Sequence, residues 1–410
     1  MNNEIYDIAI VGAGAAGLMA GVVSCRLNKK ICIIDKNEKA GKKIYITGKG
    51  RCNLTNLSAP RDFLEAVVNN RKFLNGCLYS FTPEDTVEFF ESLGLKLKTE
   101  RGNRVFPVSD KASDVSKALV NNFSGEFLFE TTVKKIIKQE NYFDIKLDYN
   151  GSIKKIFAKK VIIATGGITY PSTGSTGDGY EFAKYFDHTI VEPICALTAL
   201  HVADDVKKLQ GLSLKNVTAT IGKESEFGEM LFTSNGVSGP IILTLSSKVN
   251  RNKFPQSLSI DLKPALSDEQ LNFRLLRDFS AEPNKSIKNV LVSLLPKSLI
   301  EVVLQKSYIP EYKAVNSITK EERANLIKTL KCLQFVVTEL ATKEEAIITS
   351  GGIDVKEVNP STMESKLVKG LYFAGEVLDV DAETGGYNLQ IAWSTGYKAG
   401  LSASKEDVWN

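Results

Sequence analysis

The segment YDIAIVGAGAAG, residues 6–17, decides the fold. Its apolar first half is typical of a strand that is buried on both faces of a parallel sheet. A glycine-rich turn follows directly, then a helix-compatible run of small residues at 15–27 and a second apolar run, KICIID, at 30–35. The order of strand, turn, helix and strand predicts a βαβ unit of the dinucleotide-binding type.

The glycines of the turn have the G-x-G-x-x-G spacing. Gly12 permits the tight turn, Gly14 lets a pyrophosphate approach the backbone, and Gly17 allows the helix to pack closely on the strand. The N-terminus of the helix then faces the phosphates. Asp35 ends the second strand, where its carboxylate can bond ribose hydroxyls and disfavours a 2′-phosphate, so FAD or NAD fits better than NADP.

Bulk composition limits the classes of protein to consider. A chain of 410 residues suggests two or three domains, and 43% hydrophobic with 24% charged residues is ordinary for a globular protein. No apolar run approaches the roughly 18 residues of a membrane span, so we expect a cytoplasmic protein with no membrane partner. Six cysteines without a CxxC pair and two histidines argue against a disulfide framework and against a metal site.

Charge is uneven along the chain. The net charge is +4, but residues 29–51 hold eight Lys/Arg against Asp35 and Glu38, a local +6. This cluster is either a solvated surface or an attraction for phosphates, on a cofactor or on a nucleic acid.

Changes of pattern along the chain predict a discontinuous first domain. We assign residues 1–190 to the first part of a Rossmann-like α/β domain and residues 341–410 to its second part. Between them, 191–266 is expected to form an inserted antiparallel β domain and 267–340 a helical subdomain.

Two further glycine-rich regions indicate the cofactor. The first is Ala164–Gly167, ATGG, followed by TGDG at 176–179, and it resembles the second FAD contact region of fumarate-reductase-type, two-dinucleotide-binding flavoproteins. In the second, at 370–390, a strand ends at Gly375-Glu376, Asp379 follows, and a helix begins near Tyr387. Three such motifs in this order predict an FAD site, with the last helix directed at the flavin.

Several longer motifs carry a more specific resemblance. They are GKGRCNLTN, FTSNGVSGP, SGGI, TMESK, GLYFAGEVLDVD and GGYNLQIAWSTG, and they run from one end of the chain to the other. With them the chain resembles the YhiN/BaiN-like family of bacterial FAD-dependent flavoproteins, also called the aminoacetone oxidase family. The resemblance implies a split FAD domain with an inserted β domain and a helical subdomain. One departure is Ala382 in DVDAETGG, where a glycine is expected.

The loop ITGKGRCNLTN, residues 46–56, is the candidate for the flavin ring. Gly48 and Gly50 let the backbone lie close to the ring, Lys49 and Arg51 can face phosphate or substrate charge, and Asn53 can bond the ring edge. Cys52 has no disulfide partner nearby in the sequence, so it is either a proton donor or a small packing residue.

The candidate residues form three sets. The catalytic candidates are Cys52 and Arg51. The expected cofactor contacts are Gly12, Gly14, Ala15, Ala16, Gly17, Asp35, Lys36, Lys43, Gly48, Arg51, Cys52, Asn53, Val133, Ala164, Thr165, Gly166, Gly167, Gly375, Glu376, Asp379, Gly386, Tyr387, Asn388 and Leu389. Thr233, Asn235 and Ser238, on the turn LFTSNGVSGP, are the candidates for contact with a substrate or, equally, a structural turn.

The reaction is less well defined by the sequence. There is no second G-x-G-x-x-G fold, so NAD(P)H is expected as a transient donor that uses the substrate cleft. The family resemblance implies three chemistries: C=C reduction in a steroid-like bile-acid intermediate, oxidation of a small amino ketone, and reduction of a uridine in large-subunit ribosomal RNA. We favour C=C reduction of the 23S ribosomal RNA uridine because of the local +6. The alternatives are a small-molecule reductase, an amine oxidase and a non-catalytic flavin-binding regulator, and the oligomeric state is left open.

Overall fold

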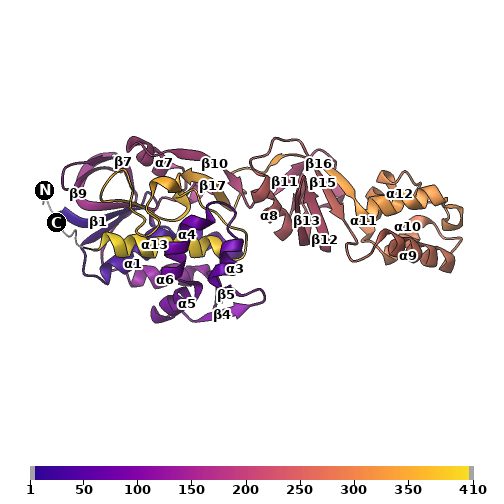
Figure 1. The fold of residues 1–410 in the computed structure, drawn as a ribbon, viewed down its shortest axis with the longest axis horizontal. Coiled ribbons are helices and arrows are strands. Elements are labelled where there is room, and N and C mark those ends of the chain that lie inside the picture. The colour runs from indigo at the N-terminus through magenta and orange to yellow at the C-terminus, as the bar shows by residue number, and fades with distance from the viewer. Residues whose placement is uncertain (1–4, 406–410) are drawn as a thin grey trace. The chain divides into compact units, whose positions relative to one another are not determined.

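The computed structural model describes residues 5–405 and divides the chain into two compact units. The first comprises Met1–Cys195 and Lys343–Asn410, and the second comprises Ala196–Thr342. Figure 1 shows the second unit as a continuous insertion in the chain of the first. The prediction of a discontinuous α/β domain with an insertion is confirmed.

The first unit is built on a twisted sheet with strand order β6-β2-β1-β9-β8-β7, and β18 pairs with β9. The strands are β1 (Ile5–Val11), β2 (Ile31–Ile34), β6 (Glu126–Leu128), β7 (Thr131–Lys138), β8 (Phe143–Tyr149), β9 (Ser152–Ile163) and β18 (Leu371–Phe373). β1 runs parallel to β2 and β9, and β18 runs parallel to β9. β7, β8 and β9 form the antiparallel meander that their alternating residues predict.

Two helices pack against each other over the sheet through glycines. They are α1 (Ala15–Cys25) and α13 (Tyr387–Ala403). A Cβ on Gly396 would lie 2.4 Å from the carbonyl oxygen of Ala16, and one on Gly400 would lie 2.6 Å from that of Ala20. The helices therefore approach to backbone contact, which only residues without a side chain permit.

Shorter elements complete the first unit. Its other helices are α2 (Lys42–Ile46), α3 (Pro60–Glu65), α4 (Arg71–Ser80), α5 (Pro83–Ser92), α6 (Ala112–Asn121) and α7 (Asp178–Tyr185). β3 (Thr55–Asn56), β5 (Arg104–Pro107) and β4 (Leu97–Glu100) form a small sheet, and β10 (Ile190–Ala196) pairs with β17 (Ile348–Ile353). The start of α5 is fixed by a capping box between Thr82 and Asp85.

The second unit is a closed antiparallel barrel with helices. The barrel order is β11-β14-β13-β12-β15-β16, formed by β11 (Leu200–Val202), β12 (Ser213–Ile221), β13 (Glu224–Phe232), β14 (Gly236–Ser238), β15 (Gln256–Asp261) and β16 (Leu333–Leu340). The helices are α8 (Pro240–Val249), α9 (Asp268–Ala281), α10 (Ile287–Val290), α11 (Lys297–Lys306) and α12 (Lys320–Lys331). Barrel and helices contribute to one hydrophobic core.

Two elements of the second unit differ from the expected pattern. The range 191–266, expected to be β, contains helix α8, and the range 267–340, expected to be helical, ends in β16. In β16, Leu333, Phe335 and Val337 are buried and alternate with exposed residues, which is the period of a strand. The helical period of α12 stops at Lys331, and the strand that follows closes the barrel.

Membrane-spanning helices and metal-ligand clusters are both absent from residues 5–405. No helix between residues 5 and 405 is long and apolar enough to cross a membrane. Within the same range, no three His, Cys, Asp or Glu side chains lie together as metal ligands would.

Candidate functional site

The sequence motifs meet at the carboxyl ends of the parallel strands. The amide of Gly12 donates to the carbonyl of Ile34 at 2.8 Å, and the amide of Ala164 donates to that of Val11 at 2.9 Å. The amide of Ala374 donates to the carbonyl of Ile163 at 3.0 Å. The loops after β1, β2, β9 and β18 are therefore adjacent, at the edge where open α/β sheets bind ligands.

The first glycine turn has the geometry of a phosphate loop. Gly12 has a φ of 106°, and a Cβ there would lie 2.5 Å from the carbonyl oxygen of Ala164. A Cβ on Gly17 would lie 1.9 Å from the carbonyl oxygen of Gly12, so this position excludes every side chain. A Cβ on Gly14 would meet nothing within 4 Å. α1 has no side-chain cap and no acidic residue in its first turn, where Ala15 and Ala16 lie, so its amides are available to an anion.

Asp35 stabilises this turn by accepting hydrogen bonds. Its Oδ2 accepts from the amide of Ala13 at 2.7 Å, and its Oδ1 accepts from the amide and the side chain of Asn37 at 2.8 and 2.9 Å. The carbonyl of Asp35 accepts from the amide of Thr131 at 3.0 Å, at the start of β7; Val133 on this strand is buried, and its contact with the cofactor stays a prediction. The role of Asp35 towards a ribose stays a prediction.

The side chain of Lys36 contacts the TGDG motif at residues 176–179. Its Nζ lies 2.5 Å from Thr176 Oγ1 and 2.5 Å from Asp178 Oδ2, at the start of α7. This ammonium group ties the loop after β2 to the loop after β9. In the structure Lys36 has a carboxylate partner, and its contact with the cofactor stays a prediction.

A polar network joins the loop that follows ATGG at 164–167 to the glycine-rich region at 370–390. Lys43 Nζ donates to both carboxylate oxygens of Glu376, at 2.9 and 2.8 Å, and to Thr169 Oγ1 at 2.9 Å. Glu376 Oε1 also accepts from the amide of Thr349 at 2.9 Å. Gly167 is adjacent, because a Cβ on it would lie 2.1 Å from Thr349 Oγ1. The side chains of Lys43 and Glu376 therefore bridge α2, the loop after β9 and the loop after β18.

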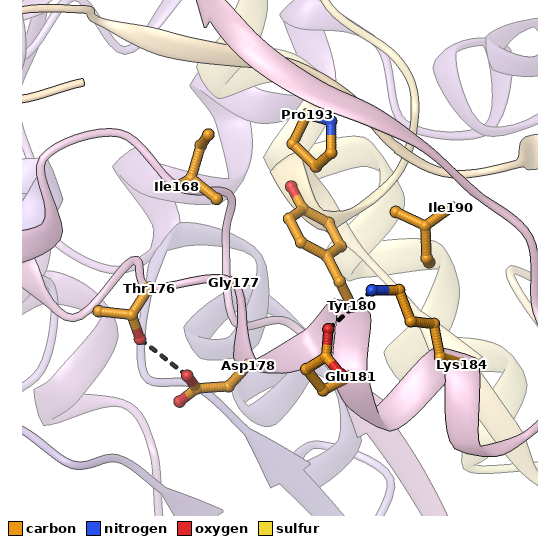
Figure 2. Close-up of a pocket in the computed structure, with 9 residues that line it drawn as sticks. All are labelled: Ile168, Thr176, Gly177, Asp178, Tyr180, Glu181, Lys184, Ile190 and Pro193. Atoms are coloured by element: carbon orange, nitrogen blue, oxygen red, sulfur yellow. Dashed lines mark hydrogen bonds and ion pairs between the residues drawn. The ribbon is translucent and has the colours of Figure 1, made fainter. Parts of the chain in front are cut away.

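Tyr180 on α7 is a residue that sequence reasoning missed. It is 4% exposed, and its hydroxyl has no hydrogen-bond partner among the described residues. Burial raises its pKa, and the carboxylates of Glu376 and Asp379 raise it further, so the phenol is neutral. Figure 2 shows its ring in a pocket that is also lined by Ile168, Thr176, Gly177, Asp178, Glu181, Lys184, Ile190 and Pro193. Nothing in the run TGDGY predicts this environment, because the carboxylates come from distant parts of the chain.

The start of α13 is arranged by the preceding loop. Gly386, with a φ of 103°, precedes the helix and offers no side-chain cap. The side chain of Asn388 accepts from the amide of Ala382 at 2.9 Å and donates to its carbonyl at 2.7 Å. Ala382 has no positive φ, which explains why alanine is accepted where glycine was expected. Tyr387 packs edge-on against Phe63 with ring centroids 4.9 Å apart.

The side chain of Asn388 therefore holds the loop before α13, and its contact with the cofactor stays a prediction. Leu389 packs against the hydrophobic core, and Asp379 accepts from Asn70 Nδ2 at 2.9 Å. Gly375, with a φ of 77°, lies against α1, since a Cβ on it would be 2.8 Å from Ala16 Cβ.

The loop at 46–56 has an unusual backbone. Gly48, Lys49, Gly50 and Cys52 all have positive φ, at 55°, 58°, 85° and 59°. Non-glycine residues in this region cost about 1–3 kcal/mol each, and such strain is concentrated at functional sites. Asn53 Oδ1 is buried with no partner among the described residues.

Cys52 faces the interior. It is 0% exposed and belongs to the hydrophobic core of the first unit. Burial raises the pKa of its thiol to about 12, against a smaller opposing effect of the Thr47 hydroxyl. This environment favours the packing role over the proton-donor role.

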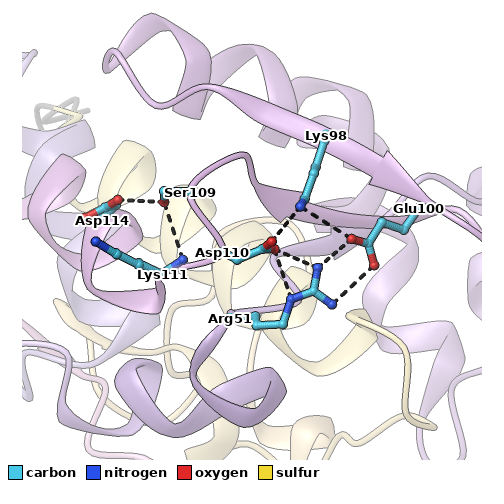
Figure 3. Close-up of polar contacts among 7 residues, drawn as sticks. All are labelled: Arg51, Lys98, Glu100, Ser109, Asp110, Lys111 and Asp114. Atoms are coloured by element: carbon cyan, nitrogen blue, oxygen red, sulfur yellow. Dashed lines mark hydrogen bonds and ion pairs between the residues drawn. The ribbon is translucent and has the colours of Figure 1, made fainter.

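Arg51 is neutralised by two carboxylates. Its guanidinium lies 2.5 Å from Glu100 Oε1 and 2.6 Å from Asp110 Oδ1, and 4.2 Å above the centre of the Phe106 ring. Lys98 donates to the other oxygen of Asp110 at 2.7 Å, as Figure 3 shows. These bonds, first from Glu100 and then from Asp110, raise the pKa of Arg51. Arg51 thus joins the 46–56 loop to the β4–β5 hairpin, and its role towards a phosphate or in catalysis stays a prediction.

Part of the local +6 is neutralised in the same way. Lys36, Lys43 and Arg51 pair with carboxylates from outside residues 29–51, whereas Lys42 pairs with Glu38, which the +6 already includes. The net charge of the protein lies elsewhere. Unit Ala196–Thr342 holds 19 Lys/Arg and 15 Asp/Glu, a net +4, while the rest of the chain has 33 of each.

The three substrate candidates lie in the second unit. Thr233 and Asn235 are in the turn between β13 and β14, where the amide of Thr233 donates to the carbonyl of Gly236 at 2.9 Å. Ser238 ends β14. The structure therefore groups them on one hairpin, and their contact with a substrate stays a prediction.

The residues of the first unit fit FAD. Besides the open turn at Gly14, two buried oxygens, Thr165 Oγ1 and Asn53 Oδ1, have no hydrogen-bond partner among the described residues. These atoms lie in the loop after β9 and in the 46–56 loop, and two uncapped helix N-termini, of α1 and α13, serve the same site. Buried polar atoms without a partner are rare in folded proteins, and a polar cofactor would satisfy them.

Comparison with known proteins places the chain in a family. The family described as "HI0933-like protein Rossmann domain" matches residues 6–402. The ribosomal RNA dihydrouridine synthase of Haemophilus influenzae is 31% identical over 98% of this chain and 100% of its own length. The 3-dehydro-bile acid delta(4,6)-reductase of Clostridium scindens is 31% identical over 97% of this chain and 99% of its own.

The fold is also that of solved oxidoreductases. The 3-ketosteroid delta1-dehydrogenase of Sterolibacterium denitrificans has a TM-score of 0.54, with 12% identity, over 98% of this chain and 99% of the other. The predicted family and fold class are confirmed. The chain belongs to the HI0933-like family and is an FAD-dependent oxidoreductase.

Proposed function

We propose that the chain reduces a uridine of 23S ribosomal RNA to dihydrouridine with NAD(P)H as donor. The observation that carries this proposal is the end-to-end match to a ribosomal RNA dihydrouridine synthase, at 31% identity over 98% of the chain. The net +4 of the inserted unit is consistent with a polyanionic substrate.

The reaction balances as one hydride and one proton. NAD(P)H loses a hydride, one carbon of the uracil C5=C6 bond gains it, and the other carbon gains a proton. FAD, when bound, supplies the hydride chemistry that links donor and acceptor. Within its described residues the first unit contains one glycine-rich βαβ turn, so we expect the donor and the RNA to bind in turn at the same face of the site.

The role of the protein residues is to bind the cofactor and to hold the loops around it in place. The amides at the start of α1 would hold the pyrophosphate, and those at the start of α13 would hold the electron-rich edge of the flavin. The Lys43–Glu376 bridge fixes three of the loops around the cofactor. The Arg51–Asp110 pair fixes the 46–56 loop.

The test combines genetics with anaerobic spectroscopy. Deletion of the gene is expected to remove one dihydrouridine from 23S ribosomal RNA, and NADH or NADPH is expected to bleach the flavin of the purified protein. Protein-free ribosomal RNA from the deletion strain should then restore the flavin colour. An unchanged dihydrouridine pattern in the deletion strain contradicts the proposal.

A second candidate is reduction of a small enone. It is favoured by the match to the bile acid reductase over 97% of the chain. A steroid 4,6-dienone that restores the flavin colour, where ribosomal RNA does not, would establish it. Peroxide formation from an amino ketone without NAD(P)H would instead indicate an amine oxidase, and a flavin that no NAD(P)H bleaches would indicate a regulator.

A further inference from the structure

The 46–56 loop carries two cations with different surroundings. Arg51 is neutralised by Glu100 and Asp110. Lys49 is exposed, and within the described range it forms no ion pair and no hydrogen bond with its side chain. The structure therefore separates two residues that the sequence presents as equivalent.

The backbone of Lys49 is strained. Its φ and ψ are 58° and 41°, between Gly48 at 55° and 33° and Gly50 with a φ of 85°. Glycine adopts this left-handed conformation without cost, and a lysine does not. The amides of Arg51 and Cys52 donate to the carbonyls of Gly48 and Thr47, at 3.2 and 3.0 Å, and hold the turn. A lysine between two glycines, at a place where glycine is more stable, indicates a use for its side chain.

The 46–56 loop, which carries Lys49, lies beside the residues that precede α13. A Cβ on Gly48 would lie 2.9 Å from the amide nitrogen of Asn53. Asn53 Oδ1, a buried oxygen without a partner among the described residues, lies 3.0 Å from the place of a Cβ on Gly386, which precedes α13. The loop is thus packed beside the N-terminus of α13.

We infer that Lys49 binds an RNA phosphate next to the reacting uridine. The inference rests on the proposed function and names a contact of the same site. A flexible, unpaired ammonium group on the exposed side of the loop is suited to a phosphate as a point charge. Each phosphate contact contributes about 0.7–0.9 to the slope of log K against log salt. Arg51 contributes nothing to this slope because its charge is already balanced within the protein.

The test uses a variant that removes the charge and the strain together. Lys49→Gly is expected to raise the melting temperature of the holoenzyme, since glycine accepts the left-handed conformation. The same variant should raise KM and Kd for protein-free ribosomal RNA about 3- to 10-fold. Its salt slope should fall by about 0.7–0.9. Reduction of the flavin by NAD(P)H should be unchanged, and Lys49→Arg should keep the wild-type slope.

Lys154→Ala is the matched control. Lys154 is an exposed lysine near the start of β9, at the opposite end of that strand from Ala164, and its Nζ lies 4.9 Å from the centre of the Tyr149 ring. The Lys154→Ala variant is expected to keep the wild-type KM for RNA and the wild-type salt slope of RNA binding.

The outcomes separate the inference from the proposed function. Lys49→Gly with wild-type KM and slope overturns the inference alone, provided that the wild-type protein reduces the RNA. An equal loss of slope in Lys154→Ala, or slower flavin reduction by NAD(P)H in Lys49→Gly, also overturns it. A wild-type protein that neither binds nor reduces ribosomal RNA overturns the proposed function and the inference together.

Discussion

Replacement of Cys52 by alanine distinguishes a packing role from a proton-donor role, because the first predicts a small loss of stability and the second a large loss of rate. Cys52 is 0% exposed in the core of the first unit, so the variant removes one buried atom of about methyl size. The expected loss of unfolding free energy is about 0.5–1.5 kcal/mol, as for other single-methyl deletions. Loss of a general acid would instead slow the step that uses it by about 10²–10⁴-fold.

We expect the packing role, because the thiol is enclosed and its pKa is raised to about 12 by burial. Cys77→Ala is the matched control: Cys77 is also 0% exposed, and burial raises its pKa to about 12 as well. Urea unfolding should show a similar small loss for both variants. In anaerobic stopped-flow experiments, both should keep FAD and wild-type rates of flavin reduction and reoxidation. The packing role would be refuted if substrate reoxidised the flavin of Cys52→Ala about 10²-fold more slowly than that of the wild type, while Cys77→Ala kept the wild-type rate.

Three further substitutions test the frame of the site. Gly396→Ala should cost about 1–3 kcal/mol in urea unfolding, because its Cβ would lie 2.4 Å from the carbonyl oxygen of Ala16; an unchanged midpoint would contradict the close contact. Glu376→Gln removes the charge partner of Lys43, so it should lower the free energy of unfolding by about 1–3 kcal/mol. The variant should also retain less FAD in gel filtration. Full retention of FAD would show that the Lys43–Glu376 bridge is dispensable. Burial lowers the pKa of His188 below its ordinary 6.5, so the unfolded chain takes up its proton first as pH falls. Stability should therefore decline from pH 7 to 5, and His188→Gln should flatten this decline in urea midpoints; an equal decline in both proteins would refute the assignment.

The core of the fold was predictable from local patterns. The run YDIAIVG before the glycine turn gave the βαβ unit, and the alternation in β7 and β8 gave the meander. Helix α8 and strand β16 were not predicted. The alternation in β16 follows the helical pattern of α12 after a single residue, and closure of the barrel decides the outcome.

The site was predictable in its glycines and not in its side-chain partners. Gly17 is required by a contact with the carbonyl of Gly12 inside the motif, and Gly12 is required by the positive φ of the turn. The partners of Arg51 are 49 and 59 residues away, and Glu376 is 333 residues from Lys43. No spacing rule reveals such pairs, so the +6 of the 29–51 segment suggested a free basic patch, which carboxylates from elsewhere in the chain partly neutralise.

This neutralisation leads to a prediction about salt. If paired lysines and Arg51 do not contact the pyrophosphate, the cofactor is held by backbone amides and helix N-termini, which are short-range and enclosed. At about 1 M salt the screening length is about 3 Å, which weakens exposed charge contacts far more than enclosed ones. RNA binding, which would use Lys49 and the net +4 of the inserted unit, should therefore fall steeply with salt while FAD stays bound. Filter binding and flavin absorbance in the same salt series measure the two. Release of FAD at the salt concentration that releases RNA would show that exposed cations hold the cofactor after all.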